Sequence, residues 1–131
     1  DTAWRDGDRV IGKMAVGLPP NHHPADRPLL LDPRLIELCF QTAGSWEIGA
    51  TGQMGLPRSI GRVCVYDDAE SIEAPAQAIV QQLDAANRFD VTVVDASGRV
   101  LVQLDGYESI GYPGAIEASQ LAPFKTAMQG E

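Results

Sequence analysis

The sequence is poor in the residues on which many kinds of site depend. Two cysteines and two histidines occur in 131 residues, and their spacing is not that of a metal site. Lys and Arg number 10 against 18 Asp and Glu, which gives a net charge of −8 and argues against nucleic-acid binding, because phosphates need cations. No apolar run approaches the roughly 18 residues of a membrane span, and the N-terminus has no charged-then-apolar signal segment. We therefore expect a cytoplasmic protein that binds neither nucleic acid nor membrane and holds no metal or cofactor.

The length and composition are those of one ordinary globular domain. The chain has 44% hydrophobic and 21% charged residues, and 131 residues are too few for two typical domains. Because it begins at Asp1 and not at Met, we expect a processed or excised piece of a longer protein. Cys39 and Cys64 both lie within apolar runs, so we expect reduced core thiols that are not bridged to each other.

The first third of the chain predicts a strand, a loop and a helix. Residues 9–16 are aliphatic and flanked by glycines, as in a strand. Four prolines between residues 17 and 28 predict an irregular loop, in which His22 and His23 are expected to be solvent-exposed. Asp32 is a good helix N-cap and Pro33 suits the first helical position. A helix over residues 33–46 then carries apolar residues on more than one stripe, which is typical of a buried helix.

The remainder of the chain predicts mostly strands. Residues 59–66, 90–95 and 99–104 read as strands, the last two joined by a short turn around Gly98, with Gly106 at a bulge. Residues 76–83 fit either a helix or a strand. This order predicts an α+β hotdog fold, in which an antiparallel sheet of about five strands wraps around one central buried helix. The domain is expected to span residues 1–114, with residues 115–131 as a tail containing at most a short peripheral helix.

Two polar residues on this apolar helix require an explanation. Glu37 and Gln41 lie four positions apart and therefore share one face. Buried polar groups must be hydrogen-bonded or have a chemical role. The plainer alternative is that the helix is only partly covered and that both residues are solvated.

Several segments resemble the dehydratase domains of polyketide synthases and related polyunsaturated fatty acid synthases. "DPRLIELCFQ", residues 32–41, aligns with the family's second-half pattern "HPALLDAALQ", so that Glu37 falls on the aspartate and Gln41 on the glutamine. "LPRSI" stands where the family has an "LPFSW"-like stretch, and "FDVTVVDASGRVLVQLDGY" is similar to its last hairpin. "AWRDGDRVIGKMAVGLP" resembles the strand that leads into the second hotdog. The resemblance covers residues 3–111 and implies the C-terminal half of a double hotdog.

The resemblance also implies a reaction and a set of partners. A family dehydratase eliminates water from a β-hydroxyacyl thioester carried on the phosphopantetheine of an acyl carrier protein. A histidine in an "HxxxGxxxxP" stretch of the first hotdog is the base, and the second-half carboxyl group is the acid, a role that burial favours by raising a carboxyl pKa. Glu37 would then be the acid and Gln41 its orienting amide. The chain contains no such histidine stretch, so we expect it to be inactive without the other half.

Other interpretations remain open. Asp32 is a rival acid, although the residue four positions later, Ile36, could not orient it. The glutamate in place of the family's aspartate, together with the missing histidine, also fits a non-catalytic hotdog that serves as a scaffold or binds acyl chains. A free-standing homodimeric hotdog thioesterase or hydratase is a third possibility, and a lone half is in any case expected to self-associate. Tyr107 and Tyr112 flank the last strand and are expected to serve packing.

Overall fold

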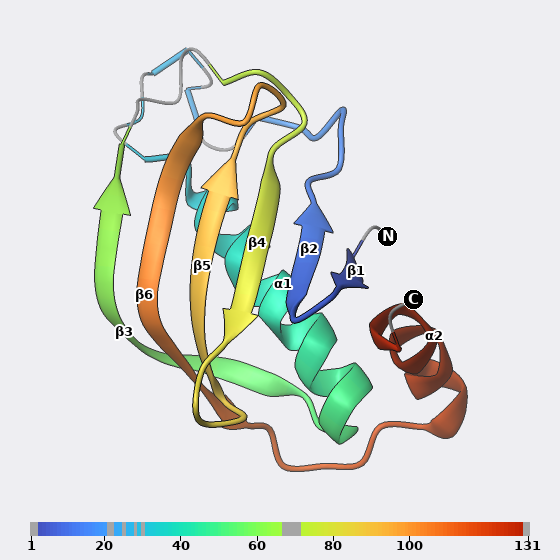
Figure 1. The fold of residues 1–131 in the computed structure, drawn as a ribbon. Helices are drawn as coiled ribbons and strands as arrows, with labels where there is room; N and C mark the ends of the chain where they lie inside the picture. The colour runs from blue at the N-terminus through green and yellow to red at the C-terminus, as the bar shows by residue number, and fades with distance from the viewer. Residues whose placement is uncertain are drawn as a thin grey trace.

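A six-stranded antiparallel sheet curls around one long helix in the computed structural model, which describes residues 3–20, 23–24, 26–27, 29, 31–66 and 72–129 (Figure 1). The elements are β1 (Ala3–Asp6), β2 (Arg9–Lys13), α1 (Pro33–Thr51), β3 (Gly55–Val65), β4 (Gln77–Gln82), β5 (Arg88–Val94), β6 (Val100–Gly111) and α2 (Ala118–Met128). The strand order is β1-β2-β4-β5-β6-β3. The predicted hotdog architecture is confirmed, with one strand more than expected.

Helix α1 begins as predicted but extends further. The Asp32 side chain accepts a hydrogen bond from the backbone N–H of Arg34 at 2.9 Å, so Asp32 is the N-cap. The helix runs through Gly44 and Gly49 and ends only at Gly52, whose φ of 74° is left-handed. An isolated glycine weakens a helix by about 1 kcal/mol without ending it. The true end is marked by the residue that needs a positive φ.

Alternating residues of the sheet fill the space over α1. In β5 the side chains of Phe89, Val91 and Val93 are buried, while their neighbours along the strand are not. Inward residues of the flanking strands complete the core together with Leu35, Leu38, Cys39 and Ala43 from α1. The segment that fitted helix or strand is strand β4, because its Ala78 and Val80 alternate inward between β2 and β5.

The last hairpin contains both of its predicted special positions. Gly98 has a φ of 88°, and the Asp95 carboxylate accepts hydrogen bonds from the backbone N–H groups of Ser97 and Arg99, each at 3.0 Å. The Ser97 hydroxyl donates at 2.6 Å and is the main cause that lowers the pKa of Asp95 to about 2. Gly106, with a φ of 65°, occupies a bulge in β6, and its N–H donates to the Asp90 carboxylate at 2.9 Å.

The tail is more closely packed than predicted. Residues 118–128 form helix α2, which lies beside the C-terminal part of α1 and next to β1 (Figure 1). A Cβ added at Gly49 would lie 2.6 Å from the Met128 side chain and 2.7 Å from the Phe124 carbonyl oxygen. Gly49 therefore allows α2 to approach α1 closely, and Met128 is only 5% exposed. None of the helices in the described residues is long and apolar enough to cross a membrane.

Candidate active site

Glu37 and Gln41 form the pair that their spacing predicts. The Gln41 side-chain amide donates a hydrogen bond to Glu37 Oε1 at 3.1 Å. Both side chains are exposed, because the sheet covers the opposite side of α1. Gly44 and Ile48 continue the same face by steps of three and four residues. The polar pair thus lies at the exposed end of a strip of the helix that is buried at Ile48, and we call these four residues the α1 strip.

A mostly apolar cleft borders the α1 strip. Its volume is about 480 Å³, within the range of small-molecule sites. The second wall is the start of β3, at Gly55, Leu56 and Pro57, and Phe124 of α2 closes one end. The cleft places the Glu37 carboxylate beside a surface suited to a hydrocarbon chain.

Three aromatic rings support this side of α1 from within. Phe40 stacks on Tyr107 with ring centroids 4.9 Å apart, and Phe89 also stacks on Tyr107, with ring centroids 5.9 Å apart. Tyr107 is 2% exposed. Burial is the largest cause that raises its pKa, followed by the charges of Glu47 and Glu37. Tyr107 was predicted to serve packing. It is a core residue, and the charges of Glu47 and Glu37 both act on its hydroxyl group.

Glu47 is a buried carboxyl group that sequence reasoning missed. It is 7% exposed, and its Oε2 accepts a hydrogen bond from Ser109 Oγ on β6 at 2.8 Å. No hydrogen-bond partner for Oε1 occurs among the described residues. A Cβ at Gly55 would lie 2.4 Å from Oε2 and 2.7 Å from Oε1, so the glycine makes room for the carboxyl group. Burial raises the pKa of Glu47, and the Ser109 hydrogen bond partly lowers it.

A sequence signal for Glu47 did exist. It stands between Trp46 and Ile48, and no basic residue lies three or four positions away on either side. A surface glutamate on a helix commonly has such a partner. The unpartnered charge within an apolar stretch therefore indicates burial.

We expect stability to depend on pH through Glu47. Because its folded-state pKa is raised, the folded state binds the proton more tightly than the unfolded state does. The stability that the protonated Glu47 contributes is fully present below pH 4.5, the ordinary pKa of the group. It is lost as pH rises through the raised pKa of the folded state. Urea unfolding between pH 4 and 8 should therefore show a smaller fall in unfolding free energy for Glu47→Gln than for the unmodified chain.

Ser109→Ala is the matched variant for this measurement. It removes the hydrogen bond that lowers the pKa of Glu47, so the pKa should rise further. The decrease in unfolding free energy with rising pH should then continue to higher pH than in the unmodified chain. If Glu47→Gln and the unmodified chain have parallel pH dependences, the carboxyl group is not held in a buried environment.

The other residues singled out in the sequence have structural positions. Asp32 caps α1, His23 lies in the loop before it, and His22 lies outside the described residues. Cys39 and Cys64 are free thiols, and burial raises the pKa of Cys39 to about 12. Tyr112 is half exposed. No group of three or more potential metal ligands occurs among the described residues.

Strand β3 forms a free edge of the sheet next to the cleft. Among the described residues it pairs only with β6, so one row of its backbone hydrogen-bonding groups has no strand partner in this part of the chain. Leu56, Val63 and Val65 on this strand are 43–45% exposed. A long edge strand with exposed apolar side chains is a typical place for another strand to pair.

Comparison with protein families gives one match across most of the chain. Residues 1–118 match the model described as the polyketide synthase dehydratase N-terminal domain. Among curated proteins, no sequence matches this chain.

Solved structures with the same fold are also dehydratase domains. The dehydratase domain from the CurF module of curacin polyketide synthase has 24% sequence identity and a TM-score of 0.65, over 84% of this chain and 38% of that one. The crystal structure of a fusion DH domain has 20% identity and a TM-score of 0.58, over 93% of this chain and 42% of that one. The CurK module dehydratase domain has 19% identity and a TM-score of 0.55, over 86% and 39%. The chain thus spans about two fifths of the length of the structures that it matches.

Proposed function

This chain belongs to the polyketide synthase dehydratase family, and we propose that it is the second, C-terminal hotdog of a two-hotdog dehydratase. The matching model is described as the N-terminal domain, but two features of the sequence support the second half. Residues 32–41 align with the family's second-half motif, and no "HxxxGxxxxP" stretch is present. The share of the related structures that the chain covers, about two fifths, is compatible with one hotdog of two.

In this proposal Glu37 supplies the acid for eliminating water from a β-hydroxyacyl thioester. A histidine of the partner hotdog removes the α-proton, the Cα–Cβ double bond forms, and Glu37 protonates the hydroxyl group that leaves as water. Gln41 holds the carboxyl group through the 3.1 Å hydrogen bond. That hydrogen bond beside an apolar cleft is the observation that carries the proposal. The reaction needs side chains only, and the acyl group arrives on the phosphopantetheine of a cytoplasmic acyl carrier protein.

The exposure of Glu37 fits a site that a partner completes. The α1 strip and the start of β3 form the two walls of the cleft, and the free edge of β3 lies beside it. A second hotdog that pairs along β3 would cover the cleft and remove the carboxyl group from water.

One observation favours a second candidate, a non-catalytic hotdog that binds acyl chains. Glutamate is one methylene longer than the family's aspartate, and a misplacement of about 1 Å can lower a catalytic rate about 10²-fold. The apolar cleft would still hold an acyl chain in such a protein. A homodimeric thioesterase or hydratase has no specific observation in its favour.

We expect the isolated chain to associate through β3. The strand offers unpaired backbone groups together with exposed Val63 and Val65. Light scattering at micromolar concentration should give a dimer or larger species. Replacing both valines by lysine should shift the mass to that of a monomer, because like charges oppose pairing at the edge.

Val16→Lys is the control, because Val16 is 76% exposed and lies outside the sheet. It should leave the association unchanged. The proposed docking edge would be contradicted if the unmodified chain is a monomer. It would also be contradicted if Val16→Lys shifts the mass to that of a monomer as the double substitution does.

A further inference from the structure

A second, chemically different cleft lies on the opposite side of α1. Its volume is about 640 Å³, and it is bounded by the β1–β2 hairpin, the end of β4, the C-terminal half of α1 and α2. Trp46 contributes to its lining from α1. Trp46 lies nine positions after Glu37, about 180° around the helix from it at 100° per residue. The cleft is therefore separate from the candidate active site.

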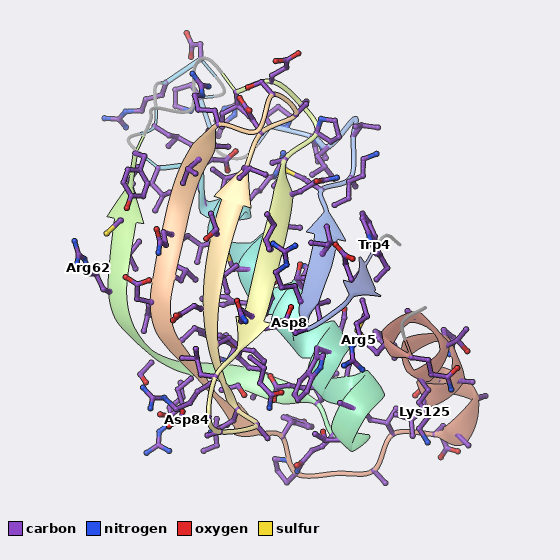
Figure 2. All side chains as sticks on the ribbon, in the orientation of Figure 1. Trp4, Arg5, Asp8, Arg62, Asp84 and Lys125 are labelled. Carbon is purple, nitrogen blue, oxygen red and sulfur yellow. The ribbon has the colours of Figure 1, made fainter. Side chains whose placement is uncertain are left out.

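Two cationic side chains from different elements line this cleft. Arg5 comes from β1 and Lys125 from α2, and both contribute to its lining. Figure 2 shows Arg5 and Asp8 at the hairpin and Lys125 on α2, with Arg62 at the far edge of the sheet. The chain has only 10 Lys and Arg and a net charge of −8. Two cationic side chains at one cleft are therefore a local concentration of positive charge.

Arg5 is held by a hydrogen bond, and neither Arg5 nor Lys125 has an ion-pair partner among the described residues. Arg5 Nε donates to the Gly7 carbonyl oxygen at 2.8 Å, which fixes the guanidinium group and leaves its terminal N–H groups to other acceptors. Within the described part of the chain, Lys125 has no hydrogen-bond or ion-pair partner. The one carboxylate in the lining, Asp8, accepts a hydrogen bond from the Gln81 amide at 3.1 Å.

The rest of the lining combines amide groups with apolar surface. The side-chain amides of Gln82 and Gln129 add neutral hydrogen-bond donors. Met128 and Val10 are almost fully buried and form apolar parts of the wall. The ring of Trp46 is held edge-on against Phe89, with centroids 5.8 Å apart. The cleft thus offers charged donors for a polyoxygen anion and an apolar surface for a carbon skeleton.

We propose that this cleft binds an organic phosphate monoester, with the phosphate between Arg5 and Lys125 and the organic part on Trp46. A phosphate dianion has three acceptor oxygens and two negative charges, and a guanidinium group together with an ammonium group supplies several donors and two positive charges, against the one negative charge of Asp8 in the lining. A carboxylate would use fewer of the donors. This site does not depend on the proposed dehydratase function, because it shares no residue with the cleft at Glu37.

Tryptophan fluorescence gives a direct test, because the chain has only two tryptophans. Trp4→Phe leaves Trp46 as the reporter in the cleft. Titration with phenyl phosphate should give a saturable change in Trp46 emission, whereas phenol and inorganic phosphate, which each supply half of the ligand, should bind at least about 10-fold more weakly. Arg5→Gln and Lys125→Gln should each weaken phenyl phosphate binding about 10-fold, the effect of losing one charged hydrogen bond.

Arg62→Gln is the matched control, because it removes the same charge from an exposed position on β3. It should leave the affinity for phenyl phosphate unchanged, and circular dichroism should show that all variants keep the fold. The proposal is overturned by an absence of saturable binding, by phenol binding as tightly as phenyl phosphate, or by an equal loss of affinity in Arg62→Gln.

Discussion

In the proposed dehydratase formed by this chain and a histidine-bearing hotdog, Glu37→Gln should lower the rate of dehydration by about 10²–10⁴-fold, the usual contribution of a general acid. The amide is nearly isosteric with the carboxyl group but cannot donate a carboxylic proton. The substitution therefore separates acid chemistry from packing. The measurement is turnover of a β-hydroxyacyl carrier-protein substrate, with unfolding curves to show that the variant remains folded.

Graded controls come from the same helix. Gln41→Ala removes the orienting hydrogen bond and leaves the acid present, so it should lower the rate less than Glu37→Gln does. Asp32→Asn should leave the dehydration rate nearly unchanged, because asparagine caps helices as well as aspartate does. The 131-residue chain by itself should show no turnover, because in the proposal the other hotdog supplies the base. Loss of activity in Asp32→Asn with retention in Glu37→Gln would mean that the acid has been misassigned.

The largest expected change in stability comes from Gly12→Ala. Gly12 lies in β2, and an added Cβ would be 1.9 Å from Thr42 Oγ1 and 2.8 Å from Thr42 Cγ2. Thr42 is 2% exposed, and its hydroxyl donates to the Leu38 carbonyl oxygen at 2.7 Å, so it cannot move away easily. Overpacking of this kind destabilises a protein by about 1–3 kcal/mol, and we expect the upper end of that range in urea unfolding.

Gly44→Ala is the contrasting substitution. No atom lies within 4 Å of the Cβ that it would add, and alanine is a better helix former than glycine by about 1 kcal/mol. The same chemical change should therefore stabilise the protein at residue 44 and destabilise it at residue 12. Equal effects at the two sites would show that β2 does not pack against α1 as described.

The sequence predicts those parts of the fold that depend on local signals. The Asp32–Pro33 helix start, the turn at Gly98 and the bulge at Gly106 all follow from conformations that few residues adopt. The end of α1 was placed too early, because Gly44 and Gly49 resemble stop signals. In the folded chain Gly49 serves the approach of α2, a long-range contact that no local pattern encodes.

The candidate site was accessible to sequence reasoning in part. The spacing of Glu37 and Gln41 predicts their hydrogen bond because both are on one element. The apolar cleft beside them was not predictable, since its walls come from α1, β3 and α2. The burial of Glu47 was indicated by its unpartnered charge within an apolar stretch. Its surroundings were not predictable, since Ser109 and Gly55 lie on two strands far from it in the sequence.

The role of Glu37 as the acid is tested most directly by comparing the dehydration rates of Glu37→Gln and Glu47→Gln in the complete dehydratase. The proposal predicts that Glu37→Gln loses about 10²–10⁴-fold, the usual contribution of a general acid. Glu47→Gln should keep most of the rate, because its carboxyl group is buried against Ser109. If Glu47→Gln loses the activity and Glu37→Gln keeps it, the buried glutamate supplies the proton and the proposed role of Glu37 is wrong.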